Sequence, residues 1–411
     1  MQNIQIRNKN TLLMIGIIFV AFTLRPAITS IGPLTGHIRD ETGISNGIAG
    51  LLTTLPLISF GLISPFVPKI ARRLGNEMSV MIGLCILGSG IMIRSAGTLS
   101  LLFSGTILIG LGIAVCNVLL PGIVKQSFPR KVGLLTGIYT LSMGVFAGLA
   151  PGLSIPLADS LGLGWRISLG IWALIILIAI GFWLPQLKVK DITFDSPKQK
   201  QTGSRIWFSS IAWQVTLFMG LQSMVYFSIT AWLPEILHTQ GFNIAIAGWM
   251  LTIFQFSGLP ANIIIPILAD RLPNQKSIAL GIGLLCLTGL FGLMFVTNKA
   301  LIICCIIMLG ISLGAAVSHG LTLIGLRAAN AKQASDLSGM AQSVGYLLAA
   351  LGPFMIGFIF DFFHTWTIPL ILLVVITVIY TIAGIGAGRN LYVLQEKINT
   401  HEHKKAPSTI A

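Results

Sequence analysis

The sequence has very little charge. Only 9% of its 411 residues are charged, whereas 54% are hydrophobic. A soluble domain carries about 25% charged residues, because charge keeps its surface in water. The few charged residues here cannot coat a soluble globule, so most of the apolar surface must face lipid. This composition excludes an ordinary soluble enzyme or binding module and favours a protein embedded in a lipid bilayer.

Cysteines and catalytic motifs are also scarce. No HExxH, GxSxG or GxxxxGK[ST] motif is present, and no two cysteines form a CxxC pair. We therefore expect no enzyme activity, no cofactor, no metal ion and no ATP-driven transport. We interpret the five cysteines as small buried apolar residues, because all of them lie inside apolar runs. They are Cys85, Cys116, Cys286, Cys304 and Cys305.

What the sequence has instead is a series of apolar runs, each long enough to cross about 30 Å of hydrocarbon. The first resembles a signal peptide, but Arg25-Pro26 interrupts it where cleavage would be expected, so we predict an uncleaved helix. The sequence thus predicts an all-α membrane protein with twelve transmembrane helices. The approximate runs are 11–36, 46–68, 78–97, 99–124, 132–157, 165–185, 206–234, 244–269, 277–297, 300–326, 335–360 and 366–388.

The runs divide into two groups of six. The segment from Gln186 to Arg205 is the only long polar break between them. We therefore predict two six-helix bundles joined by a linker and followed by a short tail. The predicted bounds are 1–187 for the N-terminal bundle, 188–205 for the linker, 206–390 for the C-terminal bundle and 391–411 for the tail.

The net charge of +14 comes from an uneven distribution of Lys and Arg. All but five of the 26 basic residues lie in the N-terminal segment, the loops from even to odd helices, or the C-terminal segments. Four of the five, Arg39, Arg94, Arg166 and Lys299, lie at the opposite helix ends, and Arg25 lies within the first run. The positive-inside rule then predicts a multi-pass cell-membrane protein with both termini in the cytoplasm. The basic balance indicates topology, and no nucleic-acid partner is expected.

The two halves also repeat each other. The segment that begins at Gly43 aligns without gaps onto the one that begins at Gly241, at an offset of 198 residues, and a second match has an offset of 202. Such parallel repeats place a substrate site between the halves, near the bilayer midplane. The identities include Ala49/Ala247, Gly50/Gly248, Thr54/Thr252, Ser59/Ser257, Pro68/Pro266, Arg73/Arg271, Leu74/Leu272, Gly137/Gly339, Pro151/Pro353 and Asp159/Asp361.

Several short segments resemble known transporter motifs. PKIARRLG at 68–75 and ADRL at 269–272 are similar to the loop motif of the major facilitator superfamily. LRPAITSIGP at 24–33, GLLTTLP at 50–56 and LAPGL at 149–153 resemble the cyanate and 2-nitroimidazole permease family. This resemblance implies the major facilitator fold, a monomer, and a small substrate that is anionic or polar and nitrogen-containing.

The resemblance to the loop motif has one departure. Arg72 stands where the superfamily usually has Asp, whereas the second half keeps Asp270 at that place. Any contact that this Asp makes in the family is therefore not expected in the first half.

Arg25 is the strongest candidate for a functional residue. It lies about 14 residues into the first run, or about 20 Å along a helix, near the bilayer midplane. An arginine there costs about 2.5–3.5 kcal/mol on insertion scales, and no Asp or Glu lies deep within a run to pair with it. A substrate anion or electronegative group could supply the missing partner, because the guanidinium fork suits flat acceptors. The alternative is a structural arginine held by backbone carbonyls.

Other polar residues within the runs extend this candidate site. Thr29 shares a helical face with Arg25, and Gln222 and Tyr226 share a face of the seventh run, so we predict two opposing cavity walls. His319 is the only histidine within a run and could bind a coupling proton. Each of these residues could instead bond a neighbouring helix. The predicted substrate-binding set is Arg25, Thr29, Asn117, Gln222, Tyr226, His319 and Gln342, with Tyr139, Gln255, Asn262 and Tyr346 as weaker candidates.

These features favour a secondary or facilitative transporter that works by alternating access, with Arg25 in its central site. A proton-coupled drug efflux antiporter is the first alternative, and it predicts dependence on His319 rather than on Arg25. A non-transporting membrane sensor on a transporter fold is the second. It would be expected to carry an added soluble domain, for which the tail at 391–411 is too short.

Overall fold

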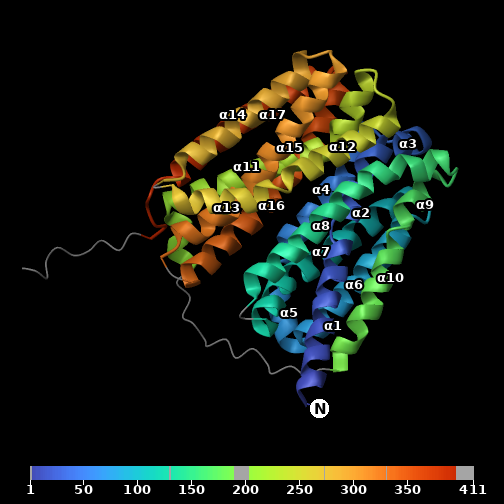
Figure 1. Ribbon diagram of the computed structural model, residues 1–411. Coiled ribbons are helices and arrows are strands. Elements are labelled where there is room, and N and C mark those ends of the chain that lie inside the picture. Colours follow the sequence, from blue (N-terminus) through green and yellow to red (C-terminus); the bar gives the residue numbers. More distant parts are fainter. Residues whose placement is uncertain (1, 129–130, 189–202, 273, 330, 395–411) are drawn as a thin grey trace, which may run out of the picture.

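The computed structural model describes residues 2–128, 131–188, 203–272, 274–329 and 331–394 (Figure 1). The regular elements over these residues are helices, and 12 segments are long and apolar enough to cross a membrane. The predicted all-α fold with twelve spans is therefore confirmed. Most of the predicted linker, 188–205, and of the predicted tail, 391–411, lies outside the described residues, and these boundaries stay predictions.

The N-terminal bundle contains α1 to α10. Their bounds are α1 Gln2–Thr23, α2 Pro26–Thr29, α3 Ile31–Thr42, α4 Asn46–Ile63, α5 Val67–Leu74, α6 Asn76–Arg94, α7 Leu99–Ser127, α8 Val132–Ile155, α9 Gly164–Gly170 and α10 Ala173–Trp183. The C-terminal bundle contains α11 to α17. Their bounds are α11 Ser210–Thr239, α12 Ile244–Gly258, α13 Ala261–Arg271, α14 Lys276–Phe295, α15 Lys299–Arg327, α16 Ala331–Phe363 and α17 Thr367–Ala387.

The first predicted span is broken at Arg25. Helix α1 ends at Thr23, and α2 begins at Pro26. Proline has no N–H to donate to the carbonyl one turn earlier, so an α-helix is interrupted there. Arg94, from α6, is only 1% exposed and donates from Nη1 to the Ala27 carbonyl at 2.6 Å. Arg25 therefore lies in a short break, and a buried arginine of a neighbouring helix contacts the start of the helix that follows.

The two bundles pack through equivalent pairs of helices, α4 against α16 and α8 against α12. A Cβ on Gly50 would lie 2.5 Å from the Pro353 carbonyl oxygen, and a Cβ on Gly248 would lie 2.9 Å from the Pro151 carbonyl oxygen. The two glycines match each other in the sequence repeat, and so do the two prolines. The repeat thus encodes a pseudo-symmetric interface in which glycine lets the backbones of two helices touch.

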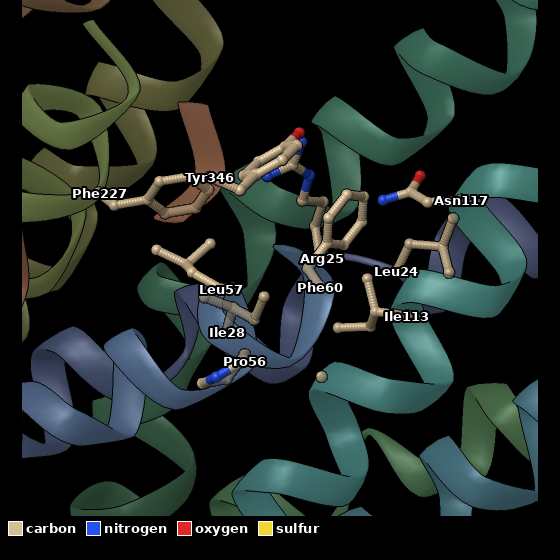
Figure 2. A pocket seen from close by; sticks show the side chains of 11 residues that line it. Leu24, Arg25, Ile28, Pro56, Leu57, Phe60, Ile113, Asn117, Phe227 and Tyr346 are labelled. Carbon is tan, nitrogen blue, oxygen red and sulfur yellow. The ribbon is translucent and has the colours of Figure 1, made fainter. Parts of the chain in front are cut away.

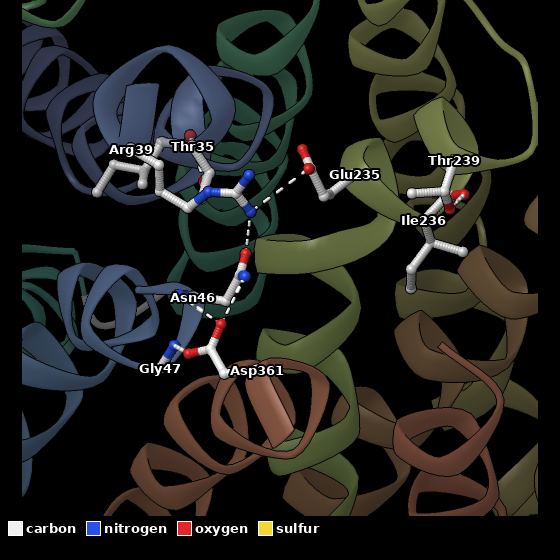
Figure 3. A network of polar contacts seen from close by, with 9 residues as sticks. Thr35, Arg39, Asn46, Gly47, Glu235, Ile236, Thr239 and Asp361 are labelled. Atoms are coloured by element: carbon white, nitrogen blue, oxygen red, sulfur yellow. Dashed lines mark hydrogen bonds and ion pairs between the residues drawn. The ribbon is translucent and has the colours of Figure 1, made fainter. Parts of the chain in front are cut away.

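The bundles meet at one end and part toward the end where the N-terminus lies (Figure 1). We call the first the closed end and the second the open end. At the closed end, Arg39 bonds Asn46 and lies 3.5 Å from Glu235. Asp361 accepts hydrogen bonds from the backbone N–H groups of Asn46 and Gly47, at 3.0 and 2.6 Å (Figure 3). The closed end is thus held by polar contacts between the two halves.

Candidate functional site

A cavity of about 640 Å³ lies between the two bundles. Its size is in the range of small-molecule sites, about 300–1,000 Å³. Residues of α7 and α8 contribute from the N-terminal bundle, and residues of α11, α12, α15 and α16 contribute from the other. The lining includes Thr136, Pro266 and Thr322. Each lies near a helix end that has a basic residue close by, which is Lys131, Arg271 and Arg327 in turn. The cavity therefore extends toward the ends of helices where basic residues gather.

Among the described residues that line this cavity, Arg25 is the only one with a formally charged side chain. Its guanidinium carbon lies 6.0 Å from the ring centroid of Phe227. The rings of Phe60 and Tyr346, from opposite bundles, lie beside it with their centroids 4.4 Å apart (Figure 2). A recess of about 10 Å³, room for about one water molecule, adjoins Arg25 on the side of Leu57. The guanidinium is thus surrounded mainly by apolar and aromatic groups.

No carboxylate of the described residues pairs with Arg25. The ion pairs in this part of the chain join His37 to Asp159, Arg39 to Glu235 and Arg166 to Glu41. A cation that lines a cavity without a counter-charge creates a positive potential that favours anions and electronegative groups. The absence of an acidic partner, which the sequence predicts, therefore holds for the described residues.

The Glu41 pair lies away from the cavity and has a separate role. The hydrogen bonds from Arg166 and then from Trp165 hold the pKa of the Glu41 carboxyl below its usual value. Both donors lie in the same bundle as Glu41, and the pair is largely exposed. It contributes to the surface of the N-terminal bundle rather than to the contact between the halves.

Four further residues of the predicted set line the same cavity as Arg25. These are Asn117, Gln222, Tyr226 and Gln342. The Tyr226 hydroxyl donates to Oε1 of Gln255 at 2.8 Å, which brings a weaker candidate into the same wall. Of the two predicted walls, Arg25, Gln222 and Tyr226 line the cavity, while their role in binding stays a prediction.

Thr29 is not among the residues that line the cavity. It is 1% exposed, and its hydroxyl bonds the Arg25 carbonyl at 3.3 Å. The prediction of a shared face assumed one continuous helix, whereas the helix is broken between Thr23 and Pro26. The break changes the direction of the residues that follow it.

His319 does not line the cavity either. Its ring is 0% exposed, meets Phe218 edge-on with centroids 5.5 Å apart, and has no hydrogen-bond partner at either nitrogen within the described chain. Its neighbours Ser318 and Leu321 do line the cavity. Helix α15 is apolar on all sides, with a mean hydropathy of 2.7, so its rotation about its own axis could not be read from the sequence.

Tyr346 was a weaker candidate, but the two phenylalanines beside Arg25 were not predicted as site residues. Phe60 and Phe227 line both the cavity and the recess beside it. They are apolar residues in apolar helices, so no contrast in the sequence distinguishes them from residues that face lipid or a bundle core. Only the packing of the two halves brings them to Arg25.

The chain matches the model of the Major Facilitator Superfamily over residues 14–353. It is 47% identical to "Uncharacterized transporter YycB" of Bacillus subtilis, over 94% of this chain and 95% of that protein. It is 42% identical to the 2-nitroimidazole transporter of Escherichia coli, over 93% of this chain and 97% of that protein. It is 25% identical to the cyanate transport protein CynX of Escherichia coli, over 84% and 89%.

A solved structure shares the fold at low sequence identity. It is that of a bacterial homologue of the human lysosomal transporter Spinster, with a TM-score of 0.77 and 15% identity, over 93% of this chain and 97% of that chain. The fold, the cavity between two repeated bundles and the family match agree with one another. This chain is therefore a transporter, not an enzyme, and belongs to the Major Facilitator Superfamily.

Proposed function

We propose that this protein moves a small anion, or a small polar nitrogen compound similar to cyanate or a nitroimidazole, across the cell membrane by alternating access. The substrate binds in the cavity between the bundles, where its electronegative group accepts hydrogen bonds from Arg25. The protein acts as a secondary or facilitative transporter. Because both walls of the cavity come from one chain, a monomer suffices for transport.

The observation that carries this proposal is the unpaired charge of Arg25 in an otherwise uncharged cavity. A planar guanidinium can donate two parallel hydrogen bonds to a nitro, carboxylate or similar group. The 2-nitroimidazole and cyanate transporters named above support the chemical class, because both names denote small compounds with strongly electronegative groups.

Two features support an inward-facing orientation. The cavity extends toward the helix ends near Lys131, Arg271 and Arg327, and the positive-inside rule assigns basic ends to the cytoplasm. The polar contacts of Arg39 and Asp361 then close the extracellular side. In the proposed cycle these contacts break, the open end closes, and the site around Arg25 becomes accessible from outside. Both termini lie in the cytoplasm in this orientation.

The test is uptake of labelled 2-nitroimidazole and of cyanate into vesicles that contain the wild type, Arg25→Ala or Arg25→Lys. We expect Arg25→Ala to lose at least tenfold in uptake, since a hydrogen bond to a charged group contributes about 1.5–3 kcal/mol. Arg25→Lys keeps the charge but not the fork and should lose less. Arg166→Ala removes an arginine outside the cavity and serves as the matched control. Normal uptake by an inserted Arg25→Ala protein would contradict the proposed site.

A further inference from the structure

Gln222, on α11, has an amide oxygen without a partner. Its side chain is 1% exposed, and Nε2 donates to the Met219 carbonyl at 3.1 Å and to the Ser223 hydroxyl at 2.8 Å. A carbonyl can only accept, so the contact with Met219 fixes which end of the amide is nitrogen. Oε1 is buried and has no hydrogen-bond partner among the described residues. The cavity wall therefore holds an unused acceptor at Gln222.

Gln255, on α12, has the complementary group without a partner. Its side chain is 8% exposed, and Oε1 accepts the hydrogen bond from Tyr226 at 2.8 Å. Nε2 is buried and has no partner in the described part of the chain. Buried polar groups are normally hydrogen-bonded, so an unpaired donor and an unpaired acceptor in one cavity wall call for a ligand that supplies both partners.

A chain of contacts connects this pair to Arg25. The Tyr226 ring lies 5.1 Å from the Phe227 ring, and the Phe227 ring lies 6.0 Å from the Arg25 guanidinium carbon. Gln255 bonds Tyr226, and Gln222 lies one helical turn before Tyr226 on α11. All five residues line the one cavity. Arg25 and the two glutamines therefore line one continuous cavity.

We infer that Gln222 and Gln255 select for a nitrogen heterocycle that carries both a ring N–H and a ring acceptor nitrogen, while Arg25 binds its electronegative substituent. The ring N–H donates to Oε1 of Gln222, and the ring acceptor receives a hydrogen bond from Nε2 of Gln255. This inference rests on the proposed function and narrows its substrate class. A simple anion such as cyanate offers acceptors only, so it leaves the Gln222 oxygen unpaired. A site built around a substrate N–H rejects analogues that lack it.

The test compares equilibrium binding of 2-nitroimidazole and 1-methyl-2-nitroimidazole to the purified full-length protein. Methylation removes the ring N–H and keeps the nitro group and the ring acceptor. We expect the wild type to bind the parent compound about tenfold more tightly than the methylated one. Gln222→Met should bring this ratio close to one, whereas Gln222→Glu keeps an acceptor oxygen and should keep the preference. The ratio is measured within each variant, so a lower yield of folded protein does not change it.

Two further variants complete the test. Gln255→Met should weaken both nitroimidazoles to a similar extent, because both keep the ring acceptor, and should leave the ratio unchanged. Gln240→Met replaces an exposed glutamine that bonds the Leu293 carbonyl outside the cavity, and it should change neither affinity. Cyanate binding should be insensitive to Gln222→Met and to Gln240→Met, because cyanate has no N–H to donate.

Equal binding of the two nitroimidazoles by the wild type would overturn the inference, and so would a ratio that survives Gln222→Met. Either result leaves the proposed function standing if Arg25→Ala still abolishes uptake. If the folded wild type binds none of the probes, the proposed function and the inference are both contradicted.

Discussion

Asp361 and Asp159 occupy matching positions in the two halves of the repeat but make different contacts. Asp361, at the end of α16, accepts from the first backbone N–H groups of α4 and from Nδ2 of Asn46, and so joins the two bundles. Asp159 lies 3.0 Å from Nε2 of His37 within its own bundle. The matching helix, α12, is capped at its start by Asn243 alone.

The difference arises from residues that the repeat does not preserve. Asn46 matches Ile244, and Arg39 matches Leu237, at the offset of 198. Only the first half therefore has side chains that extend the helix cap into a network across the interface. The glycine and proline contacts, in contrast, occur in both halves. Backbone packing is pseudo-symmetric, whereas the polar contacts described at the closed end join α4 to α16 and α3 to α11.

The largest effect is expected from adding a side chain at the two glycines that touch a proline carbonyl of the other bundle. Gly50→Leu would place side-chain atoms against the Pro353 carbonyl, and overpacking of this kind costs about 1–3 kcal/mol. We expect uptake to fall at least tenfold, with a smaller loss for Gly248→Leu because its contact is looser. Gly122→Leu, where a Cβ would meet nothing within 4 Å, is the control and should keep uptake. Equal losses of uptake in all three variants would refute a role of Gly50 and Gly248 in the contact between the bundles.

A smaller effect is expected from the asymmetric contact. Asp361→Ala removes a carboxylate from the N-terminus of α4, a loss of about 1–2 kcal/mol. It should therefore raise the population of molecules in which the bundles have separated at the closed end by roughly tenfold. Asp159→Ala should leave the population unchanged. The readout is the distance distribution between spin labels at the exposed positions 40 and 364. If the two alanine variants behave alike, the closed end does not depend on the α4–α16 side.

The Arg39–Glu235 pair should contribute less than Asp361. Nη1 of Arg39 lies 3.5 Å from Oε1 of Glu235, and both side chains keep some exposure. Such pairs contribute about 0–1 kcal/mol to stability. We expect Glu235→Gln to shift the same spin-label distances by a factor of about two to five in population. The exchanged double variant, Arg39→Glu with Glu235→Arg, should restore the wild-type distribution. If the folded double variant does not restore the wild-type distances, the two charges do not act as a pair.

The smallest effect is expected at His319. Its ring packs edge-on against Phe218, and neither nitrogen has a partner among the described residues. His319→Phe keeps an aromatic ring, slightly larger than the imidazole, in this place, so uptake should stay within about twofold. The dependence of uptake on pH should also be unchanged. A lost pH dependence would favour the proton-coupled antiporter.

Much of the fold could be predicted because lipid imposes a strong pattern. Apolar length determined the spans, and the repeat indicated two halves with a substrate site between them. That Gly50 and Pro151 lie where the halves touch came only from the structure. Arg25 stood out because a charge in an apolar run has few structural explanations. Its lack of an acidic partner could be predicted as well, since the sequence has so few Asp and Glu residues.

Other features depend on how helices rotate and pack, which the sequence does not reveal. The uniformly apolar α15 gave no indication that His319 faces Phe218 while Ser318 faces the cavity. That Thr29 is buried and does not line the cavity could be seen only in the folded helix α2. The aromatic groups near Arg25 come from different bundles, so only the tertiary contact identifies them.

An experimental structure of the protein with bound 2-nitroimidazole would test most directly whether the substrate site is centred on Arg25. We predict density in the cavity between the bundles, with the nitro oxygens about 3 Å from the Arg25 guanidinium nitrogens. Density at a place that Arg25 does not contact, with its guanidinium still unpaired, would contradict the central role assigned to this residue.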